Sequence, residues 1–577
     1  MRSRTRRLAW LTTVQAALVA GAALLVPVPA QAQGASDWPA YLFGNEHGSY
    51  NAAATAITTA NAGSLSQVWH FTPPGHLGSQ LYSTPIVYNG NVYFGSDNGN
   101  FYDLSESTGS VVWSHVTKQQ PLLSCNWPEQ PQGFVATATI APDISSSQPT
   151  VYVAAPDGYL YAWNAADGNQ LWKSVIAIPS KKVNDYFNWS SPTVDNGRIF
   201  VGVASSCDSP LVRGGERSYS QASGQLLATF HSNPTRELGG DIWSSTLVTG
   251  DGSVYVDTGN QPTGGSIGLS DSIIRLDPQT LKAKDVFTVP TAQQVGDGDF
   301  GSSPVTWTAD LGGVPTAMIG ACNKNGVFYA LRASTLASGP VWTDQLGSSP
   351  QEVHYLSLCN SSAVWDQTTS QLFLSGNFTT IGGTSFKGSV ERVDPATGVP
   401  TWQTGLPGAV LGTPTLDGSG VLAVATCDYS GAPNAVYLLS ATDGQILAML
   451  STGNTPVFGQ PAFADNYIFV ASIGQGLLAY QPPTTSVIIP SDGATLSGTS
   501  ATLDATATNA TSVEFWLFGG VYGYTGQLLC KATPTLYGWL CGWNTALVPN
   551  GSYLLLSEAL NAGGNGVSAN VNITVKN

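Results

Sequence analysis

Two carboxylates, Asp297 and Asp299, stand two residues apart in the stretch Gly-Asp-Gly-Asp-Phe at 296–300. On an extended strand, such side chains point to the same face, so both would meet one ligand. A pair of this kind suits a bound cation, or a proton-transfer group whose pKa is raised by a neighbouring charge. A hydrolase is one interpretation and a solvated acidic loop is another, because such pairs are common.

The cysteine and histidine patterns argue against several metal and cofactor sites. The sequence holds 7 cysteines and 6 histidines, without C-x-x-C, C-x-x-C-H or paired histidine spacing, so we expect no zinc ribbon and no attached haem. Cys530 and Cys541 are close in sequence and are predicted to form a disulfide. The pairing of the other five, of which at least one is free or intermolecular, stays open: Cys125, Cys207, Cys322, Cys359 and Cys427.

The composition favours short strands. Charged residues make up 10% of the 577 positions, and there are 64 glycines and 35 prolines, which are turn residues rather than helix residues. The formal net charge of −15 disfavours nucleic acid and anionic lipid as partners.

The first 32 residues have the pattern of a secretory signal peptide. An apolar run at 8–28 follows a start rich in arginine, and Ala30-Gln31-Ala32 fits a cleavage site after Ala32. We therefore expect a secreted protein, and no later stretch has the length and hydropathy of a membrane span.

A repeated unit organises the next 450 or so residues. The stretch DGYLYAWNAADGNQLW, Asp157–Trp172, is its clearest copy, and an apolar strand and an S-x-P or T-P start precede it. Strand, turn, alternating strand, D-x-x-T/D-G turn and closing strand predict a four-stranded meander whose last Trp packs between neighbouring sheets. The closing positions are Trp69, Trp113, Trp172, Ala228, Asp285, Trp342, Trp402 and Ala448.

The unmatched ends of this array predict a closed ring. The first closing strand, Leu65–Trp69, has no sheet before it, and the last strands, Gly459–Tyr480, have no closing strand after them. Together they would complete one more blade. We therefore predict an all-β protein with an eight-bladed β-propeller at 33–480, in preference to an open solenoid.

A second, smaller domain is expected after the propeller. A short linker at 481–486 leads to about seven β-type runs within 487–577, which suit an immunoglobulin-like sandwich. Trp539 and Trp543 are more often core residues than not, and the alternative is an exposed carbohydrate-stacking patch.

The opening segment Asp37–Trp69 and the Trp-closed repeats resemble the quinoprotein alcohol dehydrogenase superfamily over roughly residues 37–480. The resemblance implies pyrroloquinoline quinone (PQQ) at the centre of the ring, lying on a Trp. It further implies a metal ion such as calcium, a cationic residue at the quinone oxygens and an Asp base.

Five residues match this pattern by position. Asp208, in the stretch before V-R-G, is the expected acidic metal ligand, and Arg213 of that V-R-G is a further candidate for the cofactor. Trp243 in DIWSS matches the stacking ring, Asn260 in DTGNQP the metal-ligating amide, and Lys324 in GACNKNG the quinone-contacting cation.

Two features depart from the superfamily. Where its members carry a G-D-N with the catalytic Asp, this sequence has Gly265-Ser266-Ile267, and a serine alone is no general base. Asp271 or Asp299 would have to replace it. The adjacent Cys-Cys pair is also absent, since Asn126 follows Cys125.

Three functions remain open from the sequence. One is an exported, PQQ- and calcium-dependent dehydrogenase that oxidises small alcohols and passes electrons to a separate acceptor. The second is a non-catalytic propeller that binds a glycan or a cell-envelope protein, which the fold alone does not distinguish. The third is the hydrolase built on Asp297 and Asp299.

Overall fold

The structure is a computed structural model that describes residues 36–120, 131–179, 185–208, 210–233, 237–261, 268–348 and 359–577. The predicted signal peptide, Cys125 and Ser266 lie outside these ranges. Within them, regular structure is β-strand plus six short 3-10 turns, and no helix is long and apolar enough to cross a membrane. The turns are η1 (Tyr41–Phe43), η2 (Ala62–Ser64), η3 (Thr291–Gln293), η4 (Leu336–Ser338), η5 (Gly520–Tyr522) and η6 (Thr545–Leu547).

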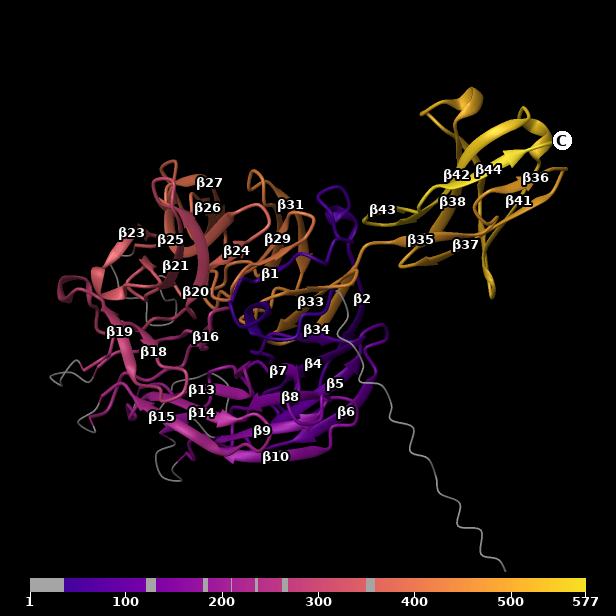
Figure 1. Ribbon diagram of the computed structural model, residues 1–577. Helices are drawn as coiled ribbons and strands as arrows, with labels where there is room; N and C mark the ends of the chain where they lie inside the picture. The colour runs from indigo at the N-terminus through magenta and orange to yellow at the C-terminus, as the bar shows by residue number, and fades with distance from the viewer. Residues whose placement is uncertain are drawn as a thin grey trace, which may run out of the picture.

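Up to residue 481, the described residues form eight sheets of four or five strands arranged around a common centre (Figure 1). The first four hold β3 (Ile86–Tyr88), β4 (Asn91–Gly95), β5 (Asn100–Ser105) and β6 (Val111–Val116); β7 (Thr139–Pro142), β8 (Pro149–Ala154), β9 (Tyr159–Asn164) and β10 (Gln170–Val175); β11 (Tyr186–Phe187), β12 (Thr193–Asp195), β13 (Arg198–Ser205), β14 (Gly215–Ser220) and β15 (Leu226–His231); β16 (Leu247–Val248), β17 (Val254–Asp257), β18 (Ser272–Leu276) and β19 (Ala283–Thr288). The others hold β20 (Val305–Asp310), β21 (Pro315–Cys322), β22 (Val327–Arg332) and β23 (Pro340–Gln345); β24 (Val364–Asp366), β25 (Gln371–Ile381), β26 (Thr384–Val393) and β27 (Pro400–Leu406); β1 (Tyr50–Asn51), β28 (Thr415–Asp417), β29 (Val421–Ala425), β30 (Ala435–Ser440) and β31 (Ile446–Ser451); β2 (Ser66–Phe71), β32 (Ala462–Ala464), β33 (Tyr467–Ser472) and β34 (Gly476–Gln481).

The two ends of the array meet in one sheet, as the sequence predicts. Strand β2 pairs antiparallel with β34, with Ser66 opposite Gln481 and Phe71 opposite Leu477. This pairing covers an edge that would otherwise be open. The chain therefore folds as an all-β propeller.

The closing tryptophans bind the next sheet by a repeated contact. Trp113 Nε1 donates to the carbonyl of Ala165 at 3.0 Å, and its ring packs on Gly168, where a Cβ would lie 2.8 Å from the ring. Gly168 has φ 71°, which only glycine adopts without strain. At closing position 285, Asp replaces Trp and instead accepts the backbone N–H of Leu336 at 2.7 Å.

The N-terminal segment 38–51 crosses the ring. It contacts the innermost strand of each sheet, or the residue just before that strand, in the order in which the sheets follow one another along the chain. Its backbone and polar side chains hydrogen-bond to the eight sheets in turn. The pairs are Trp38–Val87, Pro39–Ile140, Asn45–Val194, Asn45–Val248, His47–Pro304, Gly48–Trp365, Ser49–Leu416 and Asn51–Phe463. The segment thus ties all eight sheets together at one end of the axis.

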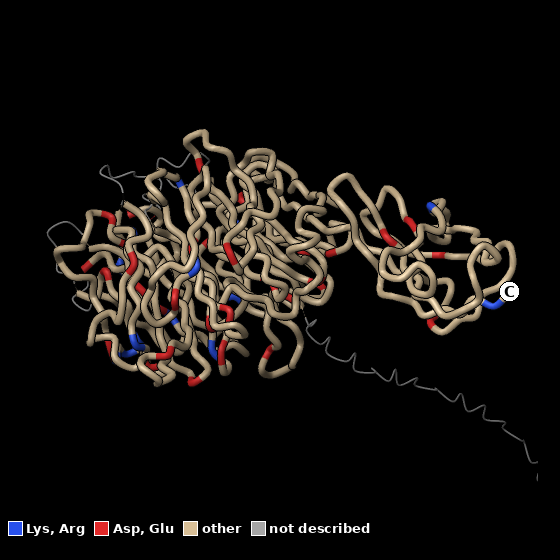
Figure 2. The backbone as a smooth tube through the Cα atoms, turned by 90° about the horizontal axis from the view of Figure 1, so that it is seen from above, with Lys and Arg blue, Asp and Glu red and all other residues tan. Residues whose placement is uncertain are grey.

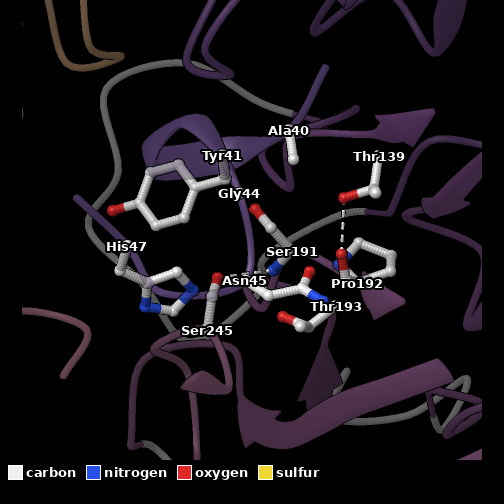
Figure 3. A pocket seen from close by; sticks show the side chains of 10 residues that line it. All are labelled: Ala40, Tyr41, Gly44, Asn45, His47, Thr139, Ser191, Pro192, Thr193 and Ser245. Atoms are coloured by element: carbon white, nitrogen blue, oxygen red, sulfur yellow. Dashed lines mark hydrogen bonds between the residues drawn. The ribbon is translucent and has the colours of Figure 1, made fainter. Parts of the chain in front are cut away.

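A belt of hydroxyl groups surrounds the axis next to this segment. Seven backbone N–H groups in the belt each donate to the hydroxyl of the next sheet at 2.8–3.1 Å. The donors are at Thr84, Thr137, Ser191, Ser245, Ser303, Ser362 and Gln460, and Thr413 takes part through its accepting hydroxyl. The hydroxyls of Ser303, Ser362 and Thr413 lie close enough to Tyr41 to oppose the rise that burial causes in its pKa. A cavity of about 10 Å³ remains beside its ring, lined also by His47 and Ser245 (Figure 3), which is room for about one water molecule.

Residues after 481 form a separate two-sheet unit beside the ring (Figure 1). One sheet holds β35 (Thr484–Ile489), β37 (Ala501–Thr508), β41 (Gly538–Trp543) and β40 (Thr533–Thr535). The other holds β36 (Ala494–Leu496), β44 (Val571–Val575), β42 (Gly551–Asn561), β38 (Ser512–Phe518), β39 (Gln527–Lys531) and β43 (Gly564–Val567). Trp543 is buried in its core and Trp539 is half-buried against it, so the structure places both as packing residues.

The described cysteines confirm one predicted bond and resolve others. Cys530 and Cys541 form the expected disulfide. Cys322 pairs with Cys359, which links two neighbouring sheets. Cys207 is also disulfide-bonded, and Cys427 is free and buried. Charged side chains are sparse over the whole backbone (Figure 2).

Candidate functional site

Residues from five loops converge at the end of the axis opposite the N-terminal segment. Trp243 precedes β16 and Asn260 follows β17, so the two ends of this hairpin bring them together. The other members come from loops after β13, after β19 and between β21 and β22. We call the set Trp243, Asn260, Asp208, Asp297, Asp299 and Lys324 the carboxylate–lysine site.

Lys324 is the cation of this site. Its Nζ lies 2.8 Å from Asp297 Oδ1 and 2.6 Å from Asp299 Oδ2, and 5.3 Å from the centre of the Trp243 ring. Burial alone would lower the pKa of Lys324, but the charges of Asp299 and Asp297 raise it above its ordinary value. The lysine is therefore a fixed positive charge over the face of an indole ring.

Oxygen atoms suited to a hard cation meet beside this lysine. One carboxylate oxygen from each of Asp208, Asp297 and Asp299 lies within 4.8 Å of the others. The side-chain amide of Asn260 lies 3.2 Å from Asp299 Oδ1 and 3.2 Å from Asp208 Oδ2, and without a cation its NH2 group donates to both carboxylates. A cation between these groups would turn the amide, so that its oxygen joins the two carboxylate oxygens. With a cation of the calcium or magnesium type, the same three oxygens are a normal ligand set.

Further carboxylates are buried around the ligand set. Asp241 is 2% exposed, and its Oδ2 accepts from Ser205 N at 2.9 Å, while its Oδ1 has no partner among the described residues. Burial and the charges of Asp208 and Asp299 raise the pKa of Asp241. A Cβ on Gly259 would lie 2.4 Å from Asp241 Oδ1 and 2.7 Å from Asp299 Oδ1, so only glycine fits between these two carboxylates.

The pKa values of the carboxyls near the site are raised. Burial and the charge of Asp299 raise the pKa of Asp208 to about 6 and that of Asp271 to about 7. Asp271 is 3% exposed, and its Oδ1 has no partner in the described part of the chain. A carboxyl in this range changes protonation near neutral pH, which is the property that a general base needs.

The predicted residues therefore gather, with one exception. Asp208, Trp243, Asn260, Asp297, Asp299 and Lys324 lie together, and Asp271 is close enough for the charge of Asp299 to affect its pKa. Arg213 instead acts on His231 and Tyr186. It lies two residues before β14, in an isolated backbone bridge with Gly239, and its side chain has no ion pair within the described residues.

Sequence reasoning missed Asp241, Ser205 and Gly259. Ser205 Oγ lies 2.7 Å from Asp208 Oδ1 and 3.0 Å from Asp241 Oδ2, so its single O–H is shared between the two carboxylates and links them. Only Asp241 had a signal in the sequence, because it is an acidic residue two positions before Trp243. Ser205 and Gly259 have no sequence pattern of their own, because their roles depend on neighbours 36 and 18 residues away.

Comparison with known proteins adds a family. A profile of the glucose/ethanol/alcohol dehydrogenase β-propeller domain matches residues 38–336, and one of the outer membrane protein assembly factor BamB matches residues 386–488. Quinohemoprotein alcohol dehydrogenase ADH IIB of Pseudomonas putida is 24% identical over 316 residues, 48% of this chain and 43% of that protein. Polyvinylalcohol dehydrogenase of a Pseudomonas species is 26% identical over 316 residues, 48% and 46% respectively. The chain thus matches less than half the length of these curated relatives.

Solved structures agree on the fold. The quinohemoprotein alcohol dehydrogenase of Comamonas testosteroni has a TM-score of 0.61 at 18% identity, over 77% of this chain and 80% of that chain. A europium-containing methanol dehydrogenase has a TM-score of 0.64 at 16% identity, over 78% and 98%. At such identities the likeness concerns the fold alone. The first profile covers more than half of the 577 residues, and the chain belongs to the glucose/ethanol/alcohol dehydrogenase β-propeller family.

Proposed function

We propose that this protein is an exported quinoprotein-type dehydrogenase that oxidises an alcohol with PQQ and a metal ion. The observation that carries the proposal is the convergence of carboxylate oxygens from Asp208, Asp297 and Asp299 within 4.8 Å of one another, next to Lys324 over the Trp243 ring. The side-chain amide of Asn260 lies 3.2 Å from two of these carboxylates. A bound cation and a flat, electron-poor ligand would together stabilise these carboxylates, the lysine and the exposed face of the ring.

The residues present fit the two absent groups. Asp208, Asn260 and Asp299 would hold the metal ion, and Trp243 would carry the flat face of PQQ. When bound, PQQ supplies a quinone that accepts hydride from the alcohol carbon. Asp297 and Asp299 hold the Lys324 ammonium in place, so its positive charge would contact the oxygen atoms of a ligand that stacks on Trp243.

Asp271 is the better of the two candidate bases. Asp299 is engaged by Lys324 and by the backbone N–H of Asn260 at 2.6 Å, which suits a metal ligand. Asp271 has a free carboxylate oxygen and a pKa raised to about 7, which suits a group that takes a proton from a hydroxyl. In this proposal Asp271 is the general base, a role that a serine at position 266 does not fill by itself.

Reconstitution tests the proposal directly. The purified chain is mixed with PQQ and calcium or a lanthanide, and bound quinone absorbance and dye reduction by primary and secondary alcohols are measured. Lys324→Gln should lose quinone binding, while Lys282→Gln, an exposed lysine, should not. Asp271→Asn should keep quinone binding and lose turnover. Absence of quinone binding with every metal would refute the dehydrogenase.

Three finer features complete the proposal. The eight sheets would be the blades of one propeller spanning 33–480, a linker would cover 481–486, and 487–577 would be an immunoglobulin-like domain. Cleavage after Ala32 would release the chain from the cell. Electrons would pass to a separate acceptor.

A second candidate function is a binding scaffold at the cell envelope. The match of residues 386–488 to the BamB profile favours it, and so do the fully exposed side chains of Tyr524 and Leu536 on loops of the C-terminal unit. Exposed apolar tips of this kind mark contact sites for a protein or glycan. Leu536→Ser in the full chain should abolish capture of an envelope partner if this role is correct, and quinone turnover without any such capture would exclude it.

A further inference from the structure

A groove of about 680 Å³ lies at the end of the ring opposite the carboxylate–lysine site. Its walls are the N-terminal segment from Phe43 to Tyr50, strand β20, and the turns that follow β16 and β24. Thr249 and Asp251, in the turn after β16, line it, whereas Trp243 and Asn260 stand at the other end of the same hairpin. The volume is in the range of small-ligand sites.

The lining combines aromatic faces with neutral hydrogen-bonding groups. Phe43 and Trp365 are half-buried and contribute ring surface, and Gln367, Ser370 and Thr308 are exposed polar side chains. Two carboxylates, from Glu46 and Asp251, accept hydrogen bonds along the wall. None of the described lining residues is a lysine or an arginine.

The backbone presents this surface in a strained form. Phe43 has φ 75°, and His47 and Ser49 have φ 57° and 51°. Bulky residues avoid the left-handed region, and such residues cluster where a structure displays a functional surface. Phe43 is held there by an edge-to-face contact with Trp38, with ring centres 5.0 Å apart, so its ring is already fixed before any ligand arrives.

We propose that this groove binds a neutral sugar or polyol. The apolar face of a sugar ring stacks on an indole such as Trp365, and its hydroxyls pair with carboxylates, amides and hydroxyls. An anionic ligand would meet Glu46 and Asp251 without a compensating cation. A cationic ligand would need an enclosing aromatic cage, whereas this groove is open and its polar lining is mostly uncharged.

Calorimetry and tryptophan fluorescence on the full chain test the proposal without any cofactor. Maltotriose, cellotriose and xylotriose are titrated, followed by the corresponding polysaccharides, to separate free sugars from polymer surfaces. At least one trisaccharide is expected to bind with saturable quenching. The double variant Glu46→Gln with Gln367→Ala should weaken that binding by at least tenfold, and Gln170→Ala, an exposed glutamine on β10, should leave it unchanged.

The outcomes separate this site from the dehydrogenase. Sugar binding that survives Lys324→Gln and is lost in the groove variant supports the groove, whether or not quinone turnover is found. Binding of choline chloride in place of every sugar, or no binding of any probe, overturns the proposal. Because Glu46 and Gln367 are exposed, unchanged thermal melting of the variants shows that loss of binding is local.

Discussion

The side-chain amide of Asn260 lies 3.2 Å from Oδ2 of Asp208 and 3.2 Å from Oδ1 of Asp299. These two carboxylates and that of Asp297 have oxygens within 4.8 Å of one another, and like charges this close repel unless cations lie between them. We therefore expect the protein to bind hard cations even when no quinone is present. Because three carboxylates converge here, a trivalent lanthanide should bind more tightly than calcium.

Terbium luminescence sensitised by Trp243 measures this binding. Asp299→Asn should weaken terbium binding by tenfold or more, since it removes a charge shared by the cation and Lys324. Asp167→Asn, in an exposed turn of another sheet, is the matched control. Equal terbium affinity in Asp299→Asn and the original chain would show that the cation sits elsewhere.

Gly259 should be indispensable for that cation site. An added methyl group would lie 2.4 Å from Asp241 Oδ1 and 2.7 Å from Asp299 Oδ1, so Gly259→Ala must push the two carboxylates apart. We expect loss of terbium binding with a small change in melting temperature. Gly296→Ala, whose Cβ would meet nothing within 4 Å, should retain binding. Normal terbium affinity in Gly259→Ala would contradict the geometry of the site.

The fold was largely predictable because its signals are local and repeated. A strand, a D-x-x-T-G turn and a closing Trp can each be recognised from a short stretch of sequence. The unmatched strand Leu65–Trp69 predicted the pairing of β2 with β34. The hydroxyl belt was visible only as S-x-P or T-P starts. Its hydrogen bonds join residues about 50 positions apart, for example Thr137 N and Ser191 Oγ at 3.0 Å, which no local pattern reveals.

The sequence predicted which residues form the candidate site, but not how charge is distributed among its carboxylates. Trp243, Asn260 and Lys324 occupy positions that motifs mark. The distribution of charge among Asp208, Asp241 and Asp299 depends on burial and on distances between separate loops, so sequence alone left it open. Arg213 shows the limit: its motif position predicted a contact with the cofactor, but in the structure it lies near His231 and Tyr186.

Replacing Gly168 should destabilise the protein by more than the strain of its positive φ, because its turn also packs against Trp113. Gly168 and Gly90 both have positive φ, 71° and 78°. A Cβ on Gly168 would lie 2.8 Å from Trp113, while one on Gly90 would meet nothing within 4 Å. Gly90→Ala should cost about 1 kcal/mol from backbone strain alone, and Gly168→Ala about 2–4 kcal/mol because the inter-sheet Trp must also move. Chemical denaturation of both variants measures the difference, and equal costs would argue against Trp113 as the contact that joins the two sheets.

Glu216 should make the fold less stable as pH rises. Burial raises its pKa to about 8 from an ordinary value of 4.5, and its carboxyl is 0% exposed, with Thr246 Oγ1 donating to Oε1 at 2.8 Å. The folded chain therefore holds a proton that the unfolded chain releases between about pH 4.5 and pH 8. In that window this residue alone lowers the free energy of unfolding by about 1.4 kcal/mol per pH unit.

Glu216→Gln removes the titration while keeping the shape of the protonated acid. The variant should match the original chain near pH 4.5 and exceed its free energy of unfolding by a few kcal/mol at pH 8. Denaturant titrations at pH 5, 6, 7 and 8 give the slope, and Glu558→Gln, in the C-terminal unit, serves as control. Other carboxyls with a raised pKa, such as Asp103 and Glu391, remain in the variant. Its free energy of unfolding should therefore still fall as pH rises, with a slope smaller by the contribution of one proton. A constant difference across the four pH values would mean that Glu216 is ionised in the folded protein.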